Sequence, residues 1–239
     1  MSQLERLEHR LLSDFRRRGW ENLHILVALS GGLDSIALLS LMARIASPLN
    51  LQIFVGHVHH GWIYGAQGQF RNSAWSLCKK FSSKIQTPFY SNLIELKPEP
   101  RFTLEPEVTL KSESELRDFR YKCLEKFRFQ LEESYQKPTF IATAHTADDQ
   151  LETRLIQLIR GSGHKGVNAM SFKSNFLLRP LLEMSRSELS DYIKLRKCEY
   201  IDDPSNLSLD PFRNWLRNDW LKALEKKRMG SVLALGRSL

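Results

Sequence analysis

The sequence contains few cysteines, and they are far apart. Cys78, Cys123 and Cys198 are the three cysteines among 239 residues, and no two of them form a CxxC pair. This spacing supports neither a thiolate zinc site nor a disulfide framework. A sparse, odd number of thiols is typical of a reducing compartment. We therefore expect a cytoplasmic protein.

Long apolar runs are also missing. No uninterrupted apolar stretch approaches the roughly 18 residues needed to span a bilayer, and the N-terminal stretch MSQLERLEHRLLSDFRRRGW is charged throughout. A signal peptide would need an apolar central region there. The sequence also has no internal repeat and no low-complexity tract. It therefore predicts no membrane partner.

The sequence does contain enough apolar residues for a core, together with an excess of positive charge. Hydrophobic residues make up 42% of the chain, which is typical of a folded protein. The formal net charge is +8, and a basic excess of this size fits a polyanionic partner, most often nucleic acid. A basic surface that only keeps the protein soluble explains the same charge, so charge alone leaves both interpretations open.

Short apolar runs and helical periodicities alternate along the chain. Apolar runs bounded by turn signals predict five strands, at residues 23–30, 51–60, 88–96, 139–145 and 176–182. Apolar residues at helical spacing predict helices at residues 4–15, 35–46, 68–82, 112–134, 146–160, 185–197 and 211–228. This alternation predicts an α/β fold with a Rossmann-like, five-stranded parallel sheet and helices on both faces. We expect one domain over residues 1–207 and a short basic helical appendage over residues 208–239.

A glycine-paired turn interrupts the apolar run LVALSGGLDSIALL. The turn consists of Ser30, Gly31, Gly32, Leu33, Asp34 and Ser35. Two glycines allow backbone angles that side chains forbid, and we expect a positive φ at Gly32. The amides of such a strand-to-helix turn can converge on an anion, where the helix N-terminus adds partial positive charge.

The carboxylate of Asp34 restricts the kind of anion that this turn could hold. It would repel a bare phosphate but suits a phosphate that is bridged by Mg²⁺. The turn matches neither GxxxxGKS/T nor GxGxxG, which disfavours P-loop kinase and dinucleotide-binding interpretations. An ordinary tight turn with serine and aspartate caps remains an open alternative.

A histidine and two carboxylates follow the predicted strand at 139–145. His145, Asp149 and Glu152 are spaced i, i+4 and i+7, so a regular helix would place them on one face. We interpret them as a pocket for an ammonium group, because the pattern lacks the third good ligand of a metal site. A solvated helix face, with Asp149 as a favourable N-terminal charge, is the alternative. Asp148 is a candidate second ligand for Mg²⁺ or its water.

Two further groups of residues are candidates for contacts with a nucleotide. His57 and His59 would share one face of a strand, with His60 on the other, which resembles a metal cluster at first sight. Arg117 and Arg120 lie three residues apart on a predicted helix and could reach one phosphate. Two solvated arginines are the alternative to that interpretation.

The last predicted helix combines basic and aromatic residues. It contains Arg213, Arg217, Lys222, Lys226, Lys227 and Arg228, with Trp215 and Trp220 between them. RNA phosphates would be attracted to such a helix, and unpaired bases could stack on its rings. The competing interpretation, that the tryptophans belong to the core, is the more common case for an amphipathic helix.

The motifs resemble those of a known family. SGGLDS resembles the signature of the PP-loop ATP pyrophosphatases, which have an adenine nucleotide alpha hydrolase-like fold and cleave ATP between its α- and β-phosphates. HVHHGW, SESELRDFRYKCL, ATAHTADDQLET, RGSGHKG, RPLL, DDPSN and FRNWLRN resemble, in order, segments of the tRNA(Ile)-lysidine synthases. The resemblance covers about residues 20–220.

The resemblance implies a two-step reaction. ATP adenylates O2 of the wobble cytidine, position 34, in the isoleucine tRNA with a CAU anticodon, and free L-lysine then displaces AMP at C2 to form lysidine. ATP, Mg²⁺, lysine and this tRNA are therefore the implied ligands, and the resemblance also suggests a homodimer. Many family members continue into further domains that grip the acceptor stem, whereas this sequence ends at residue 239, so it is either a minimal form or truncated.

Roles for individual residues follow from the same resemblance. The turn from Ser30 to Ser35 would hold the leaving pyrophosphate, and His57 would lie in the nucleotide pocket. The implied catalytic residues are Asp34, Arg117, Arg120, His145 and Asp149; the implied lysine-binding residues are His145, Asp149 and Glu152; and the implied metal ligands are Asp34 and Asp148. The base that deprotonates the lysine amine is either Asp149 or His145.

Other functions compete with this one. A tRNA thiolase of the same superfamily is the nearest alternative, although such enzymes typically use paired cysteines that this sequence lacks. Amidating relatives need a glutaminase partner, and no nucleophilic cysteine site is visible. A non-enzymatic RNA-binding module with a degenerate nucleotide fold is disfavoured by the intact SGGLDS and DDQLET motifs.

Overall fold

The computed structural model describes residues 3–61, 65–93, 113–161, 170–201 and 211–238. The helices are α1 (Gln3–Arg17), α2 (Leu33–Ile45), α3 (Ala66–Lys84), α4 (Glu113–Tyr135), α5 (Ala147–Ile159), α6 (Arg186–Arg196), α7 (Pro211–Trp215), α8 (Leu221–Lys227) and α9 (Ser231–Ser238), with a short 3₁₀ turn η1 (Ser47–Leu49) and a π-helical segment η3 (Leu216–Trp220). The strands are β1 (His24–Ala28), β2 (Gln52–His57), β3 (Phe89–Ser91), β4 (Thr139–Ala142), β5 (Lys173–Ser174) and β6 (Leu177–Leu178).

These strands form one sheet in the order β3-β2-β1-β4-β6-β5. Neighbouring strands run parallel from β3 to β6, and β5 pairs antiparallel with β6 at the edge. The predicted α/β class is confirmed, but the sheet has six strands within the described residues instead of the five predicted. The extra strand, β5, is two exposed residues long and carries no apolar run that could have predicted it. The predicted strand at 176–182 is shortened to β6, since Pro180 has no amide hydrogen for the ladder.

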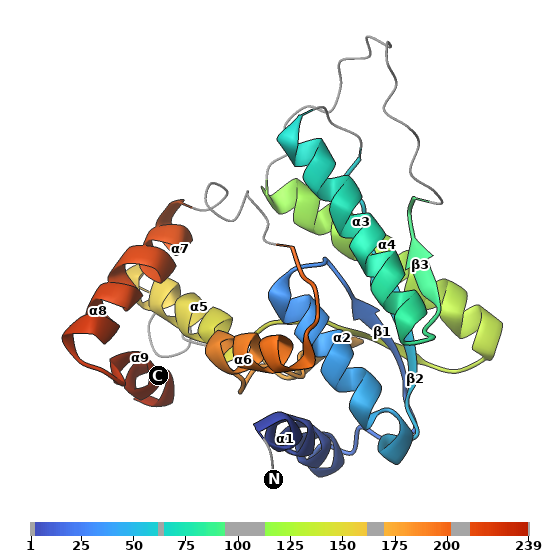
Figure 1. The fold of residues 1–239 in the computed structure, drawn as a ribbon, viewed down its shortest axis with the longest axis horizontal. Helices are drawn as coiled ribbons and strands as arrows, with labels where there is room; N and C mark the ends of the chain where they lie inside the picture. The colour runs from blue at the N-terminus through green and yellow to red at the C-terminus, as the bar shows by residue number, and fades with distance from the viewer. Residues whose placement is uncertain (1–2, 62–64, 94–112, 162–169, 202–210, 239) are drawn as a thin grey trace.

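Helices cover both faces of the sheet (Figure 1). Ile25 and Val27 of β1 pack with buried side chains of α1, α2, α3 and α6, whereas Leu26 packs with those of α4. All three are fully buried, as expected for a central parallel strand. The carboxyl ends of β1, β2 and β4 therefore open at one edge, between α2 on one side and α4 on the other.

The C-terminal helices form a smaller core of their own. Leu216 and Leu221 pack with buried residues of α5, namely Leu151, Leu155 and Ile156. In Figure 1, α7, α8 and α9 lie beside α5 at the end of the molecule away from β2 and β3. The predicted boundary between residues 207 and 208 and the DDPSN motif lie outside the described residues, as does most of RGSGHKG, so the two-domain division stays a prediction. None of the helices described here is long and apolar enough to cross a membrane.

Candidate active site

The glycine-paired turn connects β1 directly to α2. Gly31 has a φ of +91°, whereas Gly32 is the extended N-cap of α2 with a φ of −74°. The expected positive φ at Gly32 is therefore wrong, and Gly31 is the residue that needs glycine's conformational freedom. A β-carbon added to Gly31 would also lie 3.4 Å from Cys78 Sγ, because α3 packs closely behind the turn.

The backbone amides of this turn converge on one hydroxyl. Ser35 Oγ accepts from the amides of Ser30 and Gly31, each at 3.2 Å, and donates to the carbonyl of Gly32 at 2.9 Å. Ser30 Oγ lies 3.1 Å from the same hydroxyl. Inward-pointing amides at a helix N-terminus are the arrangement that an anion nest requires.

Asp34 occupies the first turn of α2 and is tied to α6. Its Oδ2 accepts a hydrogen bond from Arg186 Nε at 2.9 Å, while its Oδ1 is buried and has no partner in the described part of the chain. Burial raises the pKa of Asp34, and the charge of Arg186 opposes that shift. The backbone amide of Arg186 donates to Asp148 Oδ2 at 2.8 Å, so one residue connects both candidate metal ligands. No local motif marks Arg186, which lies 152 residues from Asp34.

The two carboxylates on α5 hold an arginine of the chain itself. Arg217 donates through Nε and Nη2 to the two oxygens of Glu152, at 2.5 and 2.7 Å, and through Nη2 to Asp149 at 3.1 Å. Arg213 lies 3.7 Å from Glu152 and donates to Thr153. The side chain of Glu152 is only 1% exposed. The prediction that Arg213 and Arg217 face RNA phosphates is thus wrong, because both turn toward α5.

Asp149 also caps its own helix. Its Oδ2 accepts from the amide and the hydroxyl of Thr146, both at 2.8 Å, and Thr146 completes the capping box. Burial would raise the pKa of Asp149, but these bonds and the charge of Arg217 bring it below its usual value. His145 lies before this cap, so the expectation that it shares the helix face of Asp149 and Glu152 is wrong.

His145 is largely shielded from solvent and neutral at physiological pH. Its Nδ1 shares a hydrogen bond of 2.9 Å with the hydroxyl of Thr143. Burial lowers the pKa of His145 to about 4, with Asp149 acting in the opposite direction and Arg179 and Arg117 adding to the decrease. An imidazole with a pKa this low is uncharged at neutral pH and is a weaker base than a free histidine.

The histidines at the end of β2 and just after it contact protein groups. His57 Nδ1 lies 2.8 Å from the carbonyl of Leu29, so this nitrogen carries the proton. Burial lowers the pKa of His57 to about 4. His59 Nε2 lies 3.1 Å from Asn72 Oδ1, and Arg120 Nη2 lies 3.3 Å from His60 Nε2. Within the described ranges there is no group of three or more acidic, histidine or cysteine side chains that could hold a metal ion.

Arg117 and Arg120 act on different strand ends. Arg120 contacts His60 after β2, whereas Arg117 lies over the ring of Tyr121 at 5.3 Å and its charge lowers the pKa of His145 after β4. Both side chains belong to exposed residues at the start of α4. That Arg117 and Arg120 bind the same phosphate stays a prediction.

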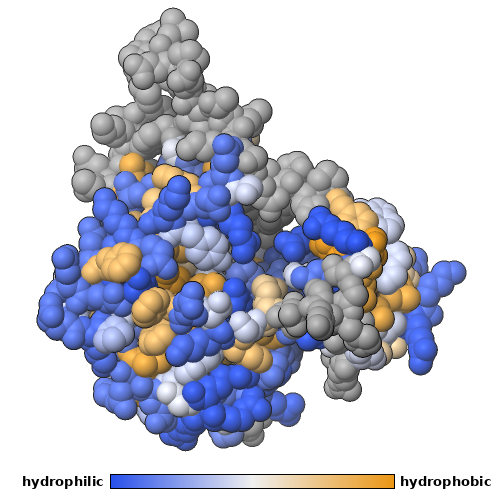
Figure 2. Space-filling view, turned by 180° about the vertical axis from the view of Figure 1, so that it is seen from behind, coloured by the Kyte–Doolittle hydropathy of each residue, from blue (hydrophilic) through white to orange (hydrophobic). Residues whose placement is uncertain are grey.

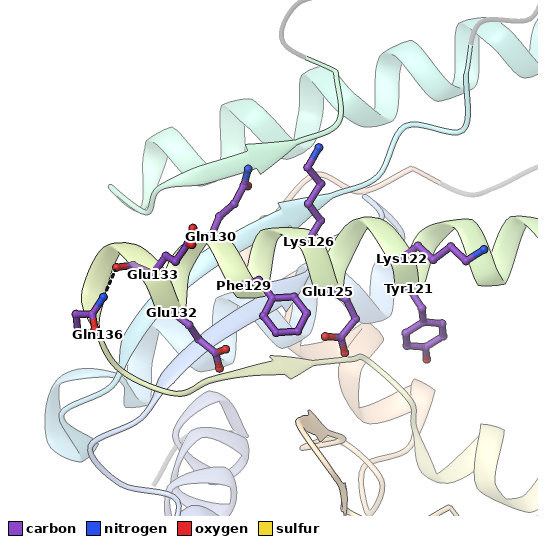
Figure 3. A pocket seen from close by; sticks show the side chains of 9 residues that line it. All are labelled: Tyr121, Lys122, Glu125, Lys126, Phe129, Gln130, Glu132, Glu133 and Gln136. Carbon is purple, nitrogen blue, oxygen red and sulfur yellow. Dashed lines mark hydrogen bonds between the residues drawn. The ribbon is translucent and has the colours of Figure 1, made fainter.

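An open hollow along α4 lies apart from these groups. Its lining comes from α4 and the residue after it, and it includes Tyr121, Glu125 and Phe129, which lie on one side of the helix, and Lys126 and Gln130 on the other (Figure 3). None of the predicted site residues lines it. The candidate active site is therefore the edge where β1, β2 and β4 end.

The fold and this strand-end turn define a class of protein. A family model for the ATP-binding PP-loop domain matches residues 3–224. The structure resembles that of the U34-tRNA thiolase NcsA of Methanococcus maripaludis, with a TM-score of 0.71, 20% identity, and coverage of 98% of this chain and 77% of that one. It also resembles an NH3-dependent NAD synthetase of Campylobacter jejuni, with a TM-score of 0.51, 12% identity, and coverage of 100% and 93%. These structural similarities show a shared fold.

Proteins with similar sequences identify the family within this class. The tRNA(Ile)-lysidine synthase of Bdellovibrio bacteriovorus is 39% identical over 233 residues, which cover 98% of this chain and 67% of that relative. That of Actinobacillus succinogenes is 32% identical over 233 residues, covering 95% and 49%. The chain belongs to the tRNA(Ile)-lysidine synthase family of PP-loop proteins. It spans between 41% and 67% of the length of the relatives compared.

Proposed function

We propose that the protein uses ATP to attach lysine to C2 of the wobble cytidine of the isoleucine tRNA with a CAU anticodon. The observation that carries the proposal is the juxtaposition of two motifs at one sheet edge. The nucleotide-type turn after β1 and the carboxylate pair of α5 lie close enough that Asp149 and Arg217 affect the pKa of Asp34. The names of the sequence relatives support the choice of this tRNA as the acceptor and of lysine as the amine.

In the first step, the cytidine oxygen attacks the α-phosphate of ATP and pyrophosphate leaves. The converging amides of Ser30 and Gly31 and the N-terminus of α2 would stabilise the charge on the leaving group. The carboxylate of Asp34 fits a Mg²⁺ ion. Its Oδ1 is buried and has no protein partner in the described residues, and the bond from Arg186 to Oδ2 holds the carboxylate in place. Bound Mg²⁺ would neutralise charge on the phosphates. Arg117 and Arg120 would approach the same charge from α4.

In the second step, a neutral amine of lysine attacks the activated C2 and AMP leaves. The α5 carboxylates can attract the amino groups of lysine, and Arg217 and Arg213 can attract its carboxylate, so the paired site complements a zwitterion. Asp149 is a weak candidate for the base, since its oxygens already accept hydrogen bonds and its pKa is lowered. The pKa of His145 is lowered as well, so Asp149 and His145 both remain candidates for the base.

The two steps can be measured separately. Pyrophosphate release should require ATP and tRNA, whereas AMP release should also require lysine. In Glu152→Gln, the apparent KM for lysine should rise about tenfold or more, since a hydrogen bond to a charged group contributes about 1.5–3 kcal/mol, while the KM for ATP should change little. Glu125→Gln, on the exposed side of α4, is the matched control. If the two KM values rise together in Glu152→Gln, the carboxylate does not bind lysine.

A further inference from the structure

Three large aromatic side chains are exposed in α7 and η3. Phe212, Trp215 and Trp220 are 38%, 46% and 38% exposed, so the interpretation of these tryptophans as core residues is wrong. The rings of Phe212 and Trp215 are stacked, with centroids 5.8 Å apart and planes 26° apart. We call these three residues the aromatic flank. It leaves extended ring faces in solvent, where a folded domain gains nothing from them.

The π-helical segment determines which side of the helix the aromatic flank occupies. Leu216 and Leu221 are five residues apart, yet they are both buried, with exposures of 1% and 8%, against α5. In an α-helix, residues five apart point about 140° from each other. The wider turn, closed by the amide of Leu221 bonding to the carbonyl of Leu216, brings them onto one side. Trp215 and Trp220 each precede one of these leucines, so they share a neighbouring side.

The surroundings of the flank are basic. Residues 211–239 contain seven arginines and lysines but two acidic residues, and two of the arginines, Arg213 and Arg217, are engaged with the carboxylates of α5. Lys226, Lys227 and Arg228 are exposed and form no ion pair within the described residues. Glu225 is engaged internally, because its carboxylate accepts from the amides of Gly230 and Val232.

The flank is adjacent to the candidate active site. Arg217, two residues after Trp215, pairs with Glu152 and Asp149. Arg213, next to Phe212, approaches the same Glu152 at 3.7 Å. Figure 2 shows apolar and intermediate side chains among hydrophilic ones over this end of the molecule, at the right of the view. The flank and the two arginines that approach the carboxylates therefore belong to the same helical segment.

We propose that the aromatic flank is a stacking platform for unpaired bases of the RNA substrate, with Lys226, Lys227 and Arg228 attracting its phosphates. The inference rests on the proposed function, since an anticodon loop offers splayed bases and a phosphate backbone next to the cytidine that reacts. Proteins hold single-stranded RNA by this combination of ring faces and positive charge. Protein interfaces are instead depleted in lysine, so the charge favours RNA over a protein partner.

Binding of the isolated anticodon stem-loop RNA tests the platform. Trp215→Leu and Trp220→Leu keep apolar volume but remove the ring face, and each should weaken binding by about 5- to 150-fold, the range that stacking of one base contributes. The slope of log affinity against log salt should stay constant, because no charge changes. Trp215→Phe should restore most of the affinity. Phe129→Leu, an exposed aromatic on α4, is the matched control and should bind normally.

A second measurement needs no variant. Ultraviolet crosslinking of the same RNA to the unmodified protein should yield crosslinked peptides that contain residues 211–220. Crosslinks confined to other segments, or unchanged affinity in the Trp215→Leu, Trp220→Leu double variant, would overturn the platform. So would a double variant that loses self-association in sedimentation experiments but binds RNA normally, because the flank would then be a contact between two copies of the chain.

The proposal about the aromatic flank and the proposed enzymatic function can fail independently of each other. If the unmodified protein binds the stem-loop through the flank but forms no lysine adduct, the platform stands and the proposed function fails. If the double variant binds RNA and forms the adduct as well as the unmodified protein, the proposed function stands and the platform fails.

Discussion

At the scale of single residues, the two glycines of the turn differ in what they tolerate. Gly31 has a positive φ and packs against Cys78 and Ala74, whereas Gly32 has an ordinary φ and enough space around it for a β-carbon in ordinary contact. Gly31→Ala should therefore lower the free energy of unfolding by about 1–2 kcal/mol, while Gly32→Ala should change it by less than about 0.5 kcal/mol. Urea unfolding measures both.

Equal destabilisation by the two alanines would contradict this assignment of backbone strain. The bulkier Gly32→Val separates stability from chemistry. Its branched side chain would approach Ser30 Oγ, which is 3.6 Å from the position of a β-carbon. If the turn holds pyrophosphate, this variant should stay folded but lose pyrophosphate release.

A second residue-scale prediction concerns the buried pair of Arg217 and Glu152. Arg217→Met would leave a carboxylate that is 1% exposed without its bidentate partner. Removal of one member of a buried pair costs about 3–5 kcal/mol, so urea unfolding should show a loss in that range. The matched control is Lys222→Met, whose amine is exposed and donates to Asn218 at 3.4 Å, and which should change stability by less than about 0.5 kcal/mol. Similar values for the two variants would mean that the pair stabilises little.

The third prediction follows from the lowered pKa of His145. Its pKa falls from 6.5 to about 4 on folding, so the unfolded chain binds a proton between these values and the folded chain does not. The free energy of unfolding should therefore decrease as the pH falls from about 6.5 to about 4. Burial is the largest cause of this shift; Asp149 opposes it, and Arg179, Arg117 and Arg213 add to it.

The variant His145→Gln isolates the contribution of this one imidazole. Its plot of unfolding free energy against pH should be less steep than that of the unmodified protein across this window. His9→Gln, at an exposed histidine of α1, is the matched control. Identical slopes for the unmodified protein and His145→Gln would show that His145 titrates alike in both states.

Residues within a motif could be identified from sequence, but their partners could not. The grouping of Ser30, Gly31 and Asp34 follows from a local pattern that a strand-to-helix turn requires. Arg186 and Arg217 carry no such pattern, because they meet their carboxylates across 152 and 65 residues. Only the folded arrangement of α6 against α2, and of η3 against α5, brings these groups together.

At the scale of elements, apolar runs predicted the buried strands and failed at the sheet edge. β1 and β2 are buried on both faces, so their sequences are almost continuously apolar. β5 is exposed and two residues long, and its pairing depends on the neighbouring β6. The π-helical segment was missed because helical periodicity assumes a constant turn. The five-residue spacing of Leu216 and Leu221 is the signal that could have indicated it.

The fourth prediction tests the basic end of α8. Reversal of the charges of Lys226 and Lys227 should reduce the salt slope of tRNA binding by about one or two, since each neutralised phosphate contributes about 0.7 to 0.9 log units. ATP affinity should be unchanged, because both lysines lie at the far end of α8 from Arg217. The matched control is reversal of Lys122 and Lys126 on α4. A salt slope that is the same before and after reversal at Lys226 and Lys227 would place the phosphate contacts elsewhere.

At the scale of the whole molecule, the parallel sheet brings distant motifs to one edge. The turn after β1, the histidines after β2 and the carboxylates after β4 belong to segments spread over more than half of the chain, yet parallel strands with adjacent positions must end side by side. This consequence of topology could be predicted from the order of strands and helices. The docking of α7, α8 and α9 onto α5 could not, since it depends on the match between two amphipathic surfaces.

The proposed reaction can be tested by mass analysis of nucleosides from the isoleucine tRNA after incubation with the protein, ATP, Mg²⁺ and lysine. We expect a cytidine joined to one lysine with loss of water, and AMP and pyrophosphate formed in equal amounts with it. No adduct should form without lysine or with the methionine tRNA that shares the CAU anticodon. An unmodified cytidine, or a nucleoside that carries sulfur instead, would contradict the proposed function.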